Sequence, residues 1–62
     1  MEQLSLKAAR VNAGYTQEAL AQKLGVVPKT VSEWENHAVP IKSLYIYAVA
    51  YVLKIDADQI RP

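Results

Sequence analysis

The sequence contains no cysteine, two glycines, three prolines, and five aromatic residues without a phenylalanine among them. Without cysteine, neither a disulfide framework nor a thiolate metal site can staple the chain. A single histidine, His37, leaves few other ways to bind zinc, so we expect no metal and no cofactor. The lack of cysteine also fits a reducing compartment.

Charge of one sign is also missing, since seven Lys and Arg residues face six Asp and Glu residues. Any role in binding nucleic acid must therefore be inferred from the pattern of residues and not from net charge. The longest apolar run, from Leu44 to Leu53, is shorter than the about 20 residues that a bilayer span needs. We expect no membrane partner and a cytoplasmic location.

The chain has 62 residues, which predicts one domain spanning 1–62. A chain of this size buries only about 60% of its unfolded surface and has little room for a deep substrate pocket. The sequence shows no nucleophile–base pair, carboxylate dyad, phosphate loop or metal cluster. We therefore expect neither an enzyme nor a small-molecule substrate.

The few prolines and glycines divide the chain into short blocks that are rich in good helix formers, and alternating strand patterns are lacking. Thr16 is suited to cap a helix, Gly14 and Gly25 to end one, and Pro28 to begin one. The pattern predicts an all-α domain of five helices, at 4–12, 16–24, 28–36, 42 or 43 to 54, and 56 or 57 to 60.

The second and third of these helices are joined by only three residues, Gly25-Val26-Val27. Two short helices with such a turn indicate a helix-turn-helix, here at about 16–36. Ala21 provides a small residue where the helices touch, and Val26 can plug the turn. Val31 and Trp34 are spaced to face inward, which leaves short polar side chains outward.

The segments YTQEALAQKLGV (15–26) and VSEWEN (31–36) resemble the phage-repressor and Cro-like (Xre-type) helix-turn-helix family. The similarity continues into Ala50, Leu53 and Ile60 and so covers nearly the whole chain. The resemblance implies a compact five-helix, lambda-repressor-like domain of bacterial or phage origin. It also implies a transcriptional regulator, such as a prophage repressor, whose recognition helix at about 28–36 enters the major groove of double-stranded DNA.

The resemblance and the outward phase of the third helix together point to a set of DNA-binding residues: Gln17, Val27, Pro28, Lys29, Thr30, Ser32, Glu33, Asn36 and Lys42. In the family, the position of Gln17 commonly holds a phosphate. A lysine can donate to guanine, and a glutamate can accept from cytosine. The resemblance further implies a structural ion pair between Arg10 and Glu35.

The sequence departs from the family pattern at three places. Val27 stands where a capping Ser or Thr is usual, although Pro28 favours the extended backbone that a cap needs. His37 stands where glycine is common, and Pro40 precedes the usual proline position by one residue. The loop before the fourth helix is therefore expected to differ in shape.

The resemblance also implies a symmetric dimer on a palindromic operator, with half-sites about 34 Å apart. The fourth helix carries no charge on any face, and a small chain cannot cover all of it. With Ile46, Val49, Ala50 and Leu53 expected inward, a homodimer interface is predicted at Leu44, Tyr45, Ala48, Tyr51 and Val52.

Other interpretations remain open at this point. The polar side chains of the third helix could form a plain solvated face, and the same fold could serve as a protein-interaction module without DNA contact. The chain could also be an antitoxin or a fragment of a longer repressor. Trp34 is expected to be a core residue and not a platform for stacking bases.

Overall fold

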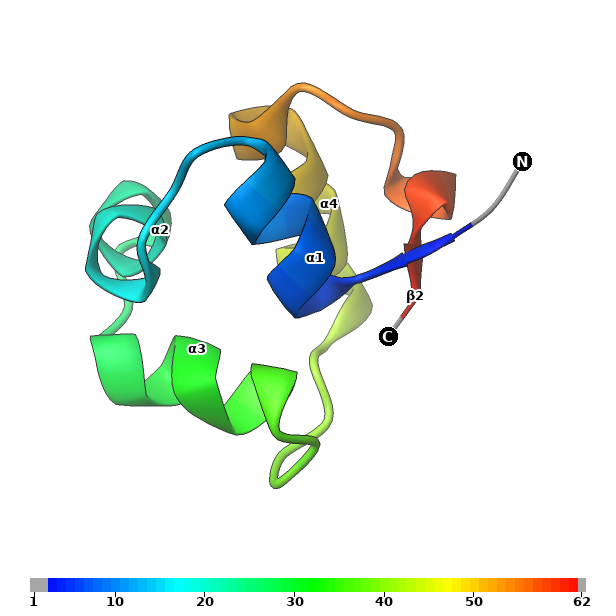
Figure 1. The fold of residues 1–62 in the computed structure, drawn as a ribbon. Helices are drawn as coiled ribbons and strands as arrows, with labels where there is room; N and C mark the ends of the chain where they lie inside the picture. Colours follow the sequence, from blue (N-terminus) through cyan, green and yellow to red (C-terminus); the bar gives the residue numbers. More distant parts are fainter. Residues whose placement is uncertain (1–2, 62) are drawn as a thin grey trace.

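The computed structural model describes residues 3–61. The elements follow in the order β1 (Leu4–Ser5), α1 (Leu6–Asn12), α2 (Gln17–Leu24), α3 (Pro28–Glu35), α4 (Ser43–Leu53), the 3-10 turn η1 (Ala57–Gln59) and β2 (Ile60–Arg61) (Figure 1). Residues 1, 2 and 62, which the sequence interpretation placed in the domain, lie outside the described residues. A mostly helical fold was predicted correctly, but the described chain has four α-helices and not five.

The helix ends are set by short local contacts. The hydroxyl of Thr16 accepts a hydrogen bond from the Ala19 N–H at 3.0 Å and caps α2, as predicted. The hydroxyl of Ser5 does the same for α1 by accepting from the Ala8 N–H at 3.1 Å. Gly25 ends α2 in the left-handed conformation, at φ 74°, which glycine adopts without a Cβ clash.

The predicted fifth helix is replaced by the single 3-10 turn η1. Asp56 precedes it with an extended backbone, and its N–H donates to the Gln59 side chain at 2.9 Å. Ile60 is extended again and pairs in parallel with Leu4, in a two-residue ladder that also joins Ser5 to Arg61. The turn is too short to form an α-helix, because the chain must leave it to reach the N-terminal strand. The same pairing explains why α1 begins at Leu6 and not at Leu4.

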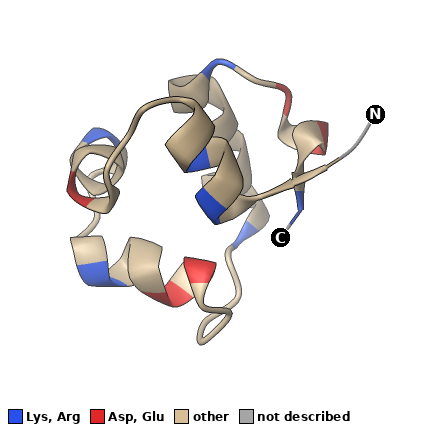
Figure 2. Ribbon diagram, in the orientation of Figure 1, with Lys and Arg blue, Asp and Glu red and all other residues tan. Residues whose placement is uncertain are grey.

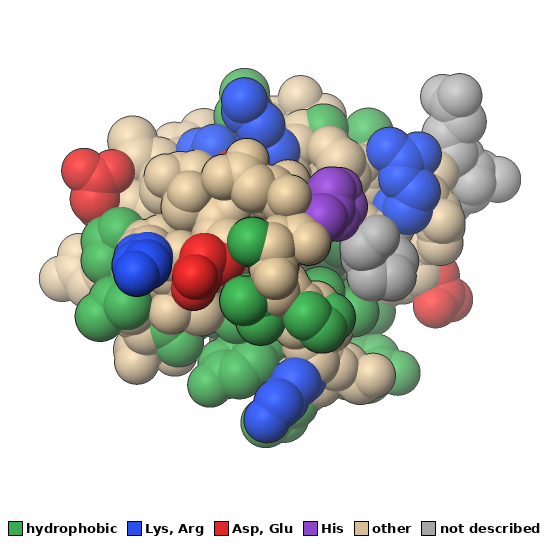
Figure 3. Space-filling view, turned by 90° about the horizontal axis from the view of Figure 1, so that it is seen from below, with side chains coloured by type: hydrophobic (Ala, Val, Ile, Leu, Met, Phe, Trp, Pro, Cys, Tyr) green, Lys and Arg blue, Asp and Glu red, His purple; other side chains and the backbone are tan. Residues whose placement is uncertain are grey.

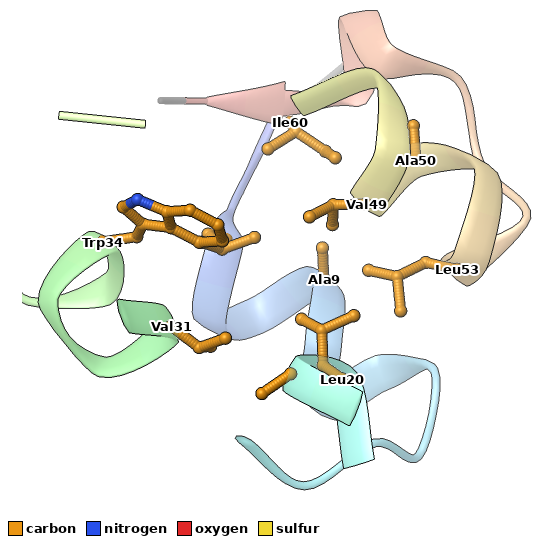
Figure 4. Close-up of a cluster of buried hydrophobic side chains, with 10 residues drawn as sticks. Ala9, Leu20, Val31, Trp34, Val49, Ala50, Leu53 and Ile60 are labelled. Atoms are coloured by element: carbon orange, nitrogen blue, oxygen red, sulfur yellow. The ribbon is translucent and has the colours of Figure 1, made fainter. Parts of the chain in front are cut away.

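The core lies where the four helices meet, and Leu20, Val31 and Val49 are its most completely buried large side chains. They come from α2, α3 and α4 and surround the small Ala9 of α1 (Figure 4). Ile60 of β2 is also buried and closes the side nearest the chain ends. Burial of these side chains is the main force holding the short helices in place.

Helix α4 packs on this core through more of its surface than predicted. The Tyr45 ring lies against Trp34, with ring centroids 5.0 Å apart and planes inclined at 43°. Tyr45 and Val52, both predicted at a dimer interface, are only half-exposed and pack against the core. With eleven residues α4 is the longest helix, and no helix within residues 3–61 is long and apolar enough to cross a membrane.

Candidate nucleic-acid interface

Helices α2 and α3 form the predicted helix-turn-helix. The residues between them are Gly25, Val26 and Val27, and the Val26 N–H donates to the Ala21 carbonyl at 3.0 Å. Ala21 itself is buried, and the Val26 side chain packs against the core and closes the turn. The turn therefore fixes α3 relative to the rest of the fold through both backbone and side-chain contacts.

The start of α3 lacks a side-chain cap. Val27 occupies the cap position with φ −83° and ψ 152°, the extended conformation that a cap residue needs, and makes no side-chain hydrogen bond. Pro28 follows at the first helical position, where the missing N–H costs nothing and where proline disfavours a helical conformation in Val27. The Val27 side chain is 61% exposed, so an apolar group stands free at the beginning of this helix.

The inner face of α3 carries the two residues that the spacing predicted. Val31 and Trp34 are buried against the core. The predicted DNA-contacting side chains are less buried: Lys29 is exposed, and Thr30, Ser32 and Glu33 are half-buried. Past the end of α3, the exposed Asn36 donates from its amide to the Ser32 hydroxyl at 3.3 Å. A polar surface that combines donors and acceptors therefore runs along α3.

Charges along α3 are separated by sign. Lys29 lies near its N-terminus, and Glu33 and Glu35 lie near its C-terminus (Figure 2). No acidic residue occupies the first turn and no basic residue the last. The helix dipole is positive at the N-terminal end, so Lys29 adds to it, while the glutamates add negative charge to the opposite end. Seen from below, the molecule accordingly shows mixed charges among apolar side chains and not a continuous basic surface (Figure 3).

Arg10 and Glu35 join α1 to the end of α3. The Arg10 Nε donates to Glu35 Oε2 at 2.6 Å, and a second guanidinium nitrogen lies 3.3 Å from Oε1. The remaining nitrogen donates to the Tyr15 carbonyl at 2.7 Å. Both side chains are largely buried, at 10% and 3% exposed. The structure thus contains the ion pair that the resemblance implied, and a backbone contact that the sequence did not indicate.

Gln17 takes part in the same network. It is the first residue of α2, and its amide Nε2 donates to Glu35 Oε1 at 2.9 Å. A carboxylate only accepts hydrogen bonds, so the amide nitrogen must face it, and one of its two N–H groups stays free of this bond. The sequence interpretation gave Gln17 to a DNA phosphate and missed its contact with Glu35. Gln17 and Glu35 lie 18 positions apart, so no local sequence pattern could reveal their contact. Only the expected Arg10–Glu35 pair could have indicated that Glu35 lies near this part of the fold.

Lys42 lies apart from the other candidate residues, at the beginning of α4. It is exposed and occupies the cap position with an extended backbone. The loop between α3 and α4 passes through His37 in the left-handed conformation, at φ 59°. Asn36 follows the C-terminus of α3 at one end of this loop, and Lys42 precedes the N-terminus of α4 at the other end.

A comparison with protein-family models now tests this assignment. A helix-turn-helix model of the Xre and lambda-repressor type matches residues 6–60, which include all four helices and the η1 turn. Comparisons with curated proteins and with solved structures gave no significant match. The family match covers far more than half of the chain. The chain belongs to the Xre and lambda-repressor type of helix-turn-helix proteins, a family of DNA-binding regulators.

Proposed function

We propose that this chain is a sequence-specific transcriptional regulator that reads DNA with α3 in the major groove. The observation that carries the proposal is the division of α3 into a buried face, with Val31 and Trp34, and a polar face on which Lys29 is exposed and the other side chains are half-buried. A major groove is wide enough for one α-helix, and short polar side chains on that helix reach the base edges.

The roles of the α3 side chains follow from their chemistry. Lys29, near the positive end of the helix, can donate to guanine O6 or N7, and Ser32 and Thr30 can donate or accept. Glu33 can accept from cytosine N4, and its charge disfavours sites where it would face a phosphate. The exposed Val27 provides an apolar contact for a thymine methyl group.

Groups around α3 are proposed to hold the DNA backbone. The free N–H of the Gln17 amide lies at the beginning of α2, where backbone donors and the helix dipole attract anions. Asn36 and Lys42 are exposed at the two ends of the loop between α3 and α4, and Pro28 is the first residue of α3. These contacts position the protein on the duplex and carry no direct information about sequence.

A net charge of +1 leaves few cations to neutralise phosphates, so one copy is expected to bind DNA weakly. We therefore propose that two copies bind together on a palindromic operator, as a homodimer with half-sites about 34 Å apart. Two copies double the number of phosphate and base contacts without any change in the chain.

Selection of bound duplexes from a random DNA pool tests the function, and the selected sequence is then used in a gel shift. A regulator yields a consensus and binds it at least a hundredfold more tightly than a scrambled duplex, since specific sites typically exceed non-specific ones by about 10³ or more. A pool that shows no consensus, together with equal weak binding to every duplex, would contradict the proposal and favour the protein-interaction module.

A further inference from the structure

An open groove beside α2 and the end of α4 brings together two lysines and two tyrosines. It has a volume of about 460 Å³ and is lined by Tyr15, Lys23, Tyr51, Val52 and Lys54, which we call the Lys–Tyr groove. No residue of α3 belongs to it. In Figure 1 the α1–α2 connection and the last turn of α4 lie at the top and α3 lies at the bottom. The groove is therefore separate from the surface proposed to read DNA.

The Lys–Tyr groove carries positive charge without a counter-charge. No aspartate or glutamate lines it. Lys23 and Lys54 are both exposed, and neither takes part in the salt bridge found within residues 3–61. Two ammonium groups beside one cavity repel each other, and an anion placed between them removes this repulsion. The groove is therefore complementary to an anion.

Lys54 holds its position at a cost to its backbone. It ends α4 in the left-handed conformation, at φ 60°. Glycine or asparagine usually fills such a position, because the Cβ of other residues is strained there. Gly25 ends α2 in this way, whereas α4 ends in a lysine. Strained residues concentrate at functional sites, so the lysine side chain is indicated to have a use beyond ending the helix.

Tyr15 and Tyr51 add aromatic surface to the same groove. Tyr15 is half-buried and packs against the core, while Tyr51 is 86% exposed and so is accessible to a ligand. Aromatic side chains of this kind stack on nucleobases. The volume of the groove lies within the about 300–1,000 Å³ of typical small-ligand sites and is larger than an inorganic phosphate alone requires. The groove therefore fits an anion that also carries an aromatic ring.

The opposite side of Tyr51 distinguishes a small ligand from a large one. There Tyr51 lines a second groove together with Tyr47, Asp56 and Asp58. A DNA duplex or an anionic lipid surface extends far beyond one groove and would bring its negative charge against these aspartates. A small anion confined to the Lys–Tyr groove avoids them.

We propose that the Lys–Tyr groove binds a nucleoside phosphate, with the phosphate between Lys23 and Lys54 and the base stacked on Tyr51. A phosphate monoester carries about two negative charges near neutral pH, which match the two ammonium groups. Each ammonium offers three donors to the phosphate oxygens. The site goes beyond the proposed function and does not depend on it, because DNA recognition by α3 uses none of these residues.

Isothermal titration calorimetry with three ligands tests the two halves of this chemistry. The probe is adenosine monophosphate, and the comparison ligands are adenosine, which lacks the anion, and inorganic phosphate, which lacks the ring. Adenosine monophosphate should bind about tenfold or more tightly than either. It should also raise Tm the most, since a ligand that binds only the folded state stabilises it. Equal affinity for the probe and either comparison ligand, or no binding of the probe at millimolar concentrations, would overturn the proposal.

Matched variants locate the bound probe. Lys54→Asn removes the charge with a residue that tolerates the left-handed conformation, so the fold is kept. Lys23→Ala is paired with Lys7→Ala, an exposed lysine of α1 outside the groove. Tyr51→Ala is paired with Tyr47→Ala, an exposed tyrosine of the same helix that does not line the groove. Each groove variant should weaken binding of adenosine monophosphate about fivefold or more and each control should not, while equal affinities in all variants would overturn the proposed site.

The same variants separate a small ligand from a macromolecule and from the proposed function. Lys54→Asn and Tyr51→Ala should bind the selected operator, a scrambled duplex and phosphatidylserine vesicles as the unaltered chain does. A larger effect of these variants on duplex or vesicle binding than on adenosine monophosphate would assign the groove to a macromolecule and refute the proposal. Failure of the unaltered chain to select any DNA consensus would refute the proposed function and leave the nucleoside phosphate site standing.

Discussion

Arg10 of α1 and Glu35 of α3 form the one salt bridge found among residues 3–61, with 2.6 Å between Nε and Oε2. Glu35 also accepts from Gln17 of α2, and Arg10 also donates to the Tyr15 carbonyl between α1 and α2. A single network thus connects three helices next to the surface proposed to meet DNA. It fixes the end of α3 while Trp34, one residue earlier, anchors the same turn in the core.

Replacing Glu35 by alanine should lower the free energy of unfolding by about 3–5 kcal/mol. The reason is that the Arg10 guanidinium would stay buried without its partner, and breaking a buried pair has this typical cost. Urea denaturation followed by circular dichroism measures the change. Glu33→Ala is the matched control, since it removes the same charge from the same helix outside the network, and surface changes usually stay within about 0.5 kcal/mol.

A double-mutant cycle decides whether the cost belongs to the pair. Once Glu35 is gone, Arg10→Ala removes an unpaired charge, so it should cost much less in the Glu35→Ala background than in the unaltered chain. Equal costs in both backgrounds would show that the two side chains act independently, against the proposed coupling.

Most of the fold follows from a few residues with strong local preferences. Thr16, Gly25 and Pro28 fixed the limits of α2 and α3 to within a residue, because each acts on the backbone next to it. The pairing of Leu4 with Ile60 was missed. Two-residue strands have no recognisable alternation, and their partner lies at the other end of the chain, so neither local pattern nor propensity could reveal it.

The candidate site was predictable to a similar degree. The faces of α3 follow from the spacing of Val31 and Trp34 alone. By contrast, the surface of α4 could not be divided correctly, because an almost wholly apolar helix has no polar face to mark its outside. Only the three-dimensional contact of Tyr45 with Trp34 shows that Tyr45 points inward and leaves Tyr47 outside.

Lys29→Ala and Ser32→Ala should each weaken binding to the selected operator by about 1–3 kcal/mol and binding to scrambled DNA much less. Both side chains lie on the polar face of α3, where loss of a base contact has this typical cost. Fluorescence anisotropy with both duplexes at one salt concentration measures the difference. Lys23→Ala, which removes the same charge from an exposed position of α2, is the control. If Lys29→Ala weakened both duplexes equally, Lys29 would be a phosphate contact.

Gln17→Ala should weaken binding to all duplexes by the same factor, about fivefold, which corresponds to the roughly 1 kcal/mol of one hydrogen bond. The proposed contact is with a phosphate, and such a contact does not depend on base sequence. Gln22→Ala, an exposed glutamine of the same helix, should leave both affinities unchanged. Unchanged affinity of Gln17→Ala on every duplex would limit the amide to its contact with Glu35.

Val27→Thr should raise the free energy of unfolding by about 1 kcal/mol, the usual contribution of a helix cap. Val27 already has the backbone conformation of a cap, and its side chain is exposed, so the added hydroxyl costs no burial. The midpoint of urea denaturation should rise accordingly. Val11→Thr, at another exposed valine within α1, offers no cap and should bring no gain. Equal midpoints for the two variants would show that the start of α3 is satisfied by other groups.

His37→Gly should also stabilise the fold, by about 1 kcal/mol, because the residue holds a φ of 59° in the loop before α4. A side chain in the left-handed region costs about 1–2 kcal/mol, and glycine avoids most of this cost while giving back part of it through greater freedom in the unfolded chain. For a domain of this size, the gain corresponds to a rise in Tm of about 4–8 °C.

Ala38→Gly, at the next position in the loop, is the matched control. Ala38 is not among the residues with positive φ in the described chain, so glycine there relieves no strain. It brings only the entropic loss and should lower Tm. A fall in Tm for both variants would mean that the His37 side chain makes contacts worth more than the strain of its backbone. A rise for His37→Gly alone would show that this departure from the family pattern costs stability, at a position where the family often has glycine.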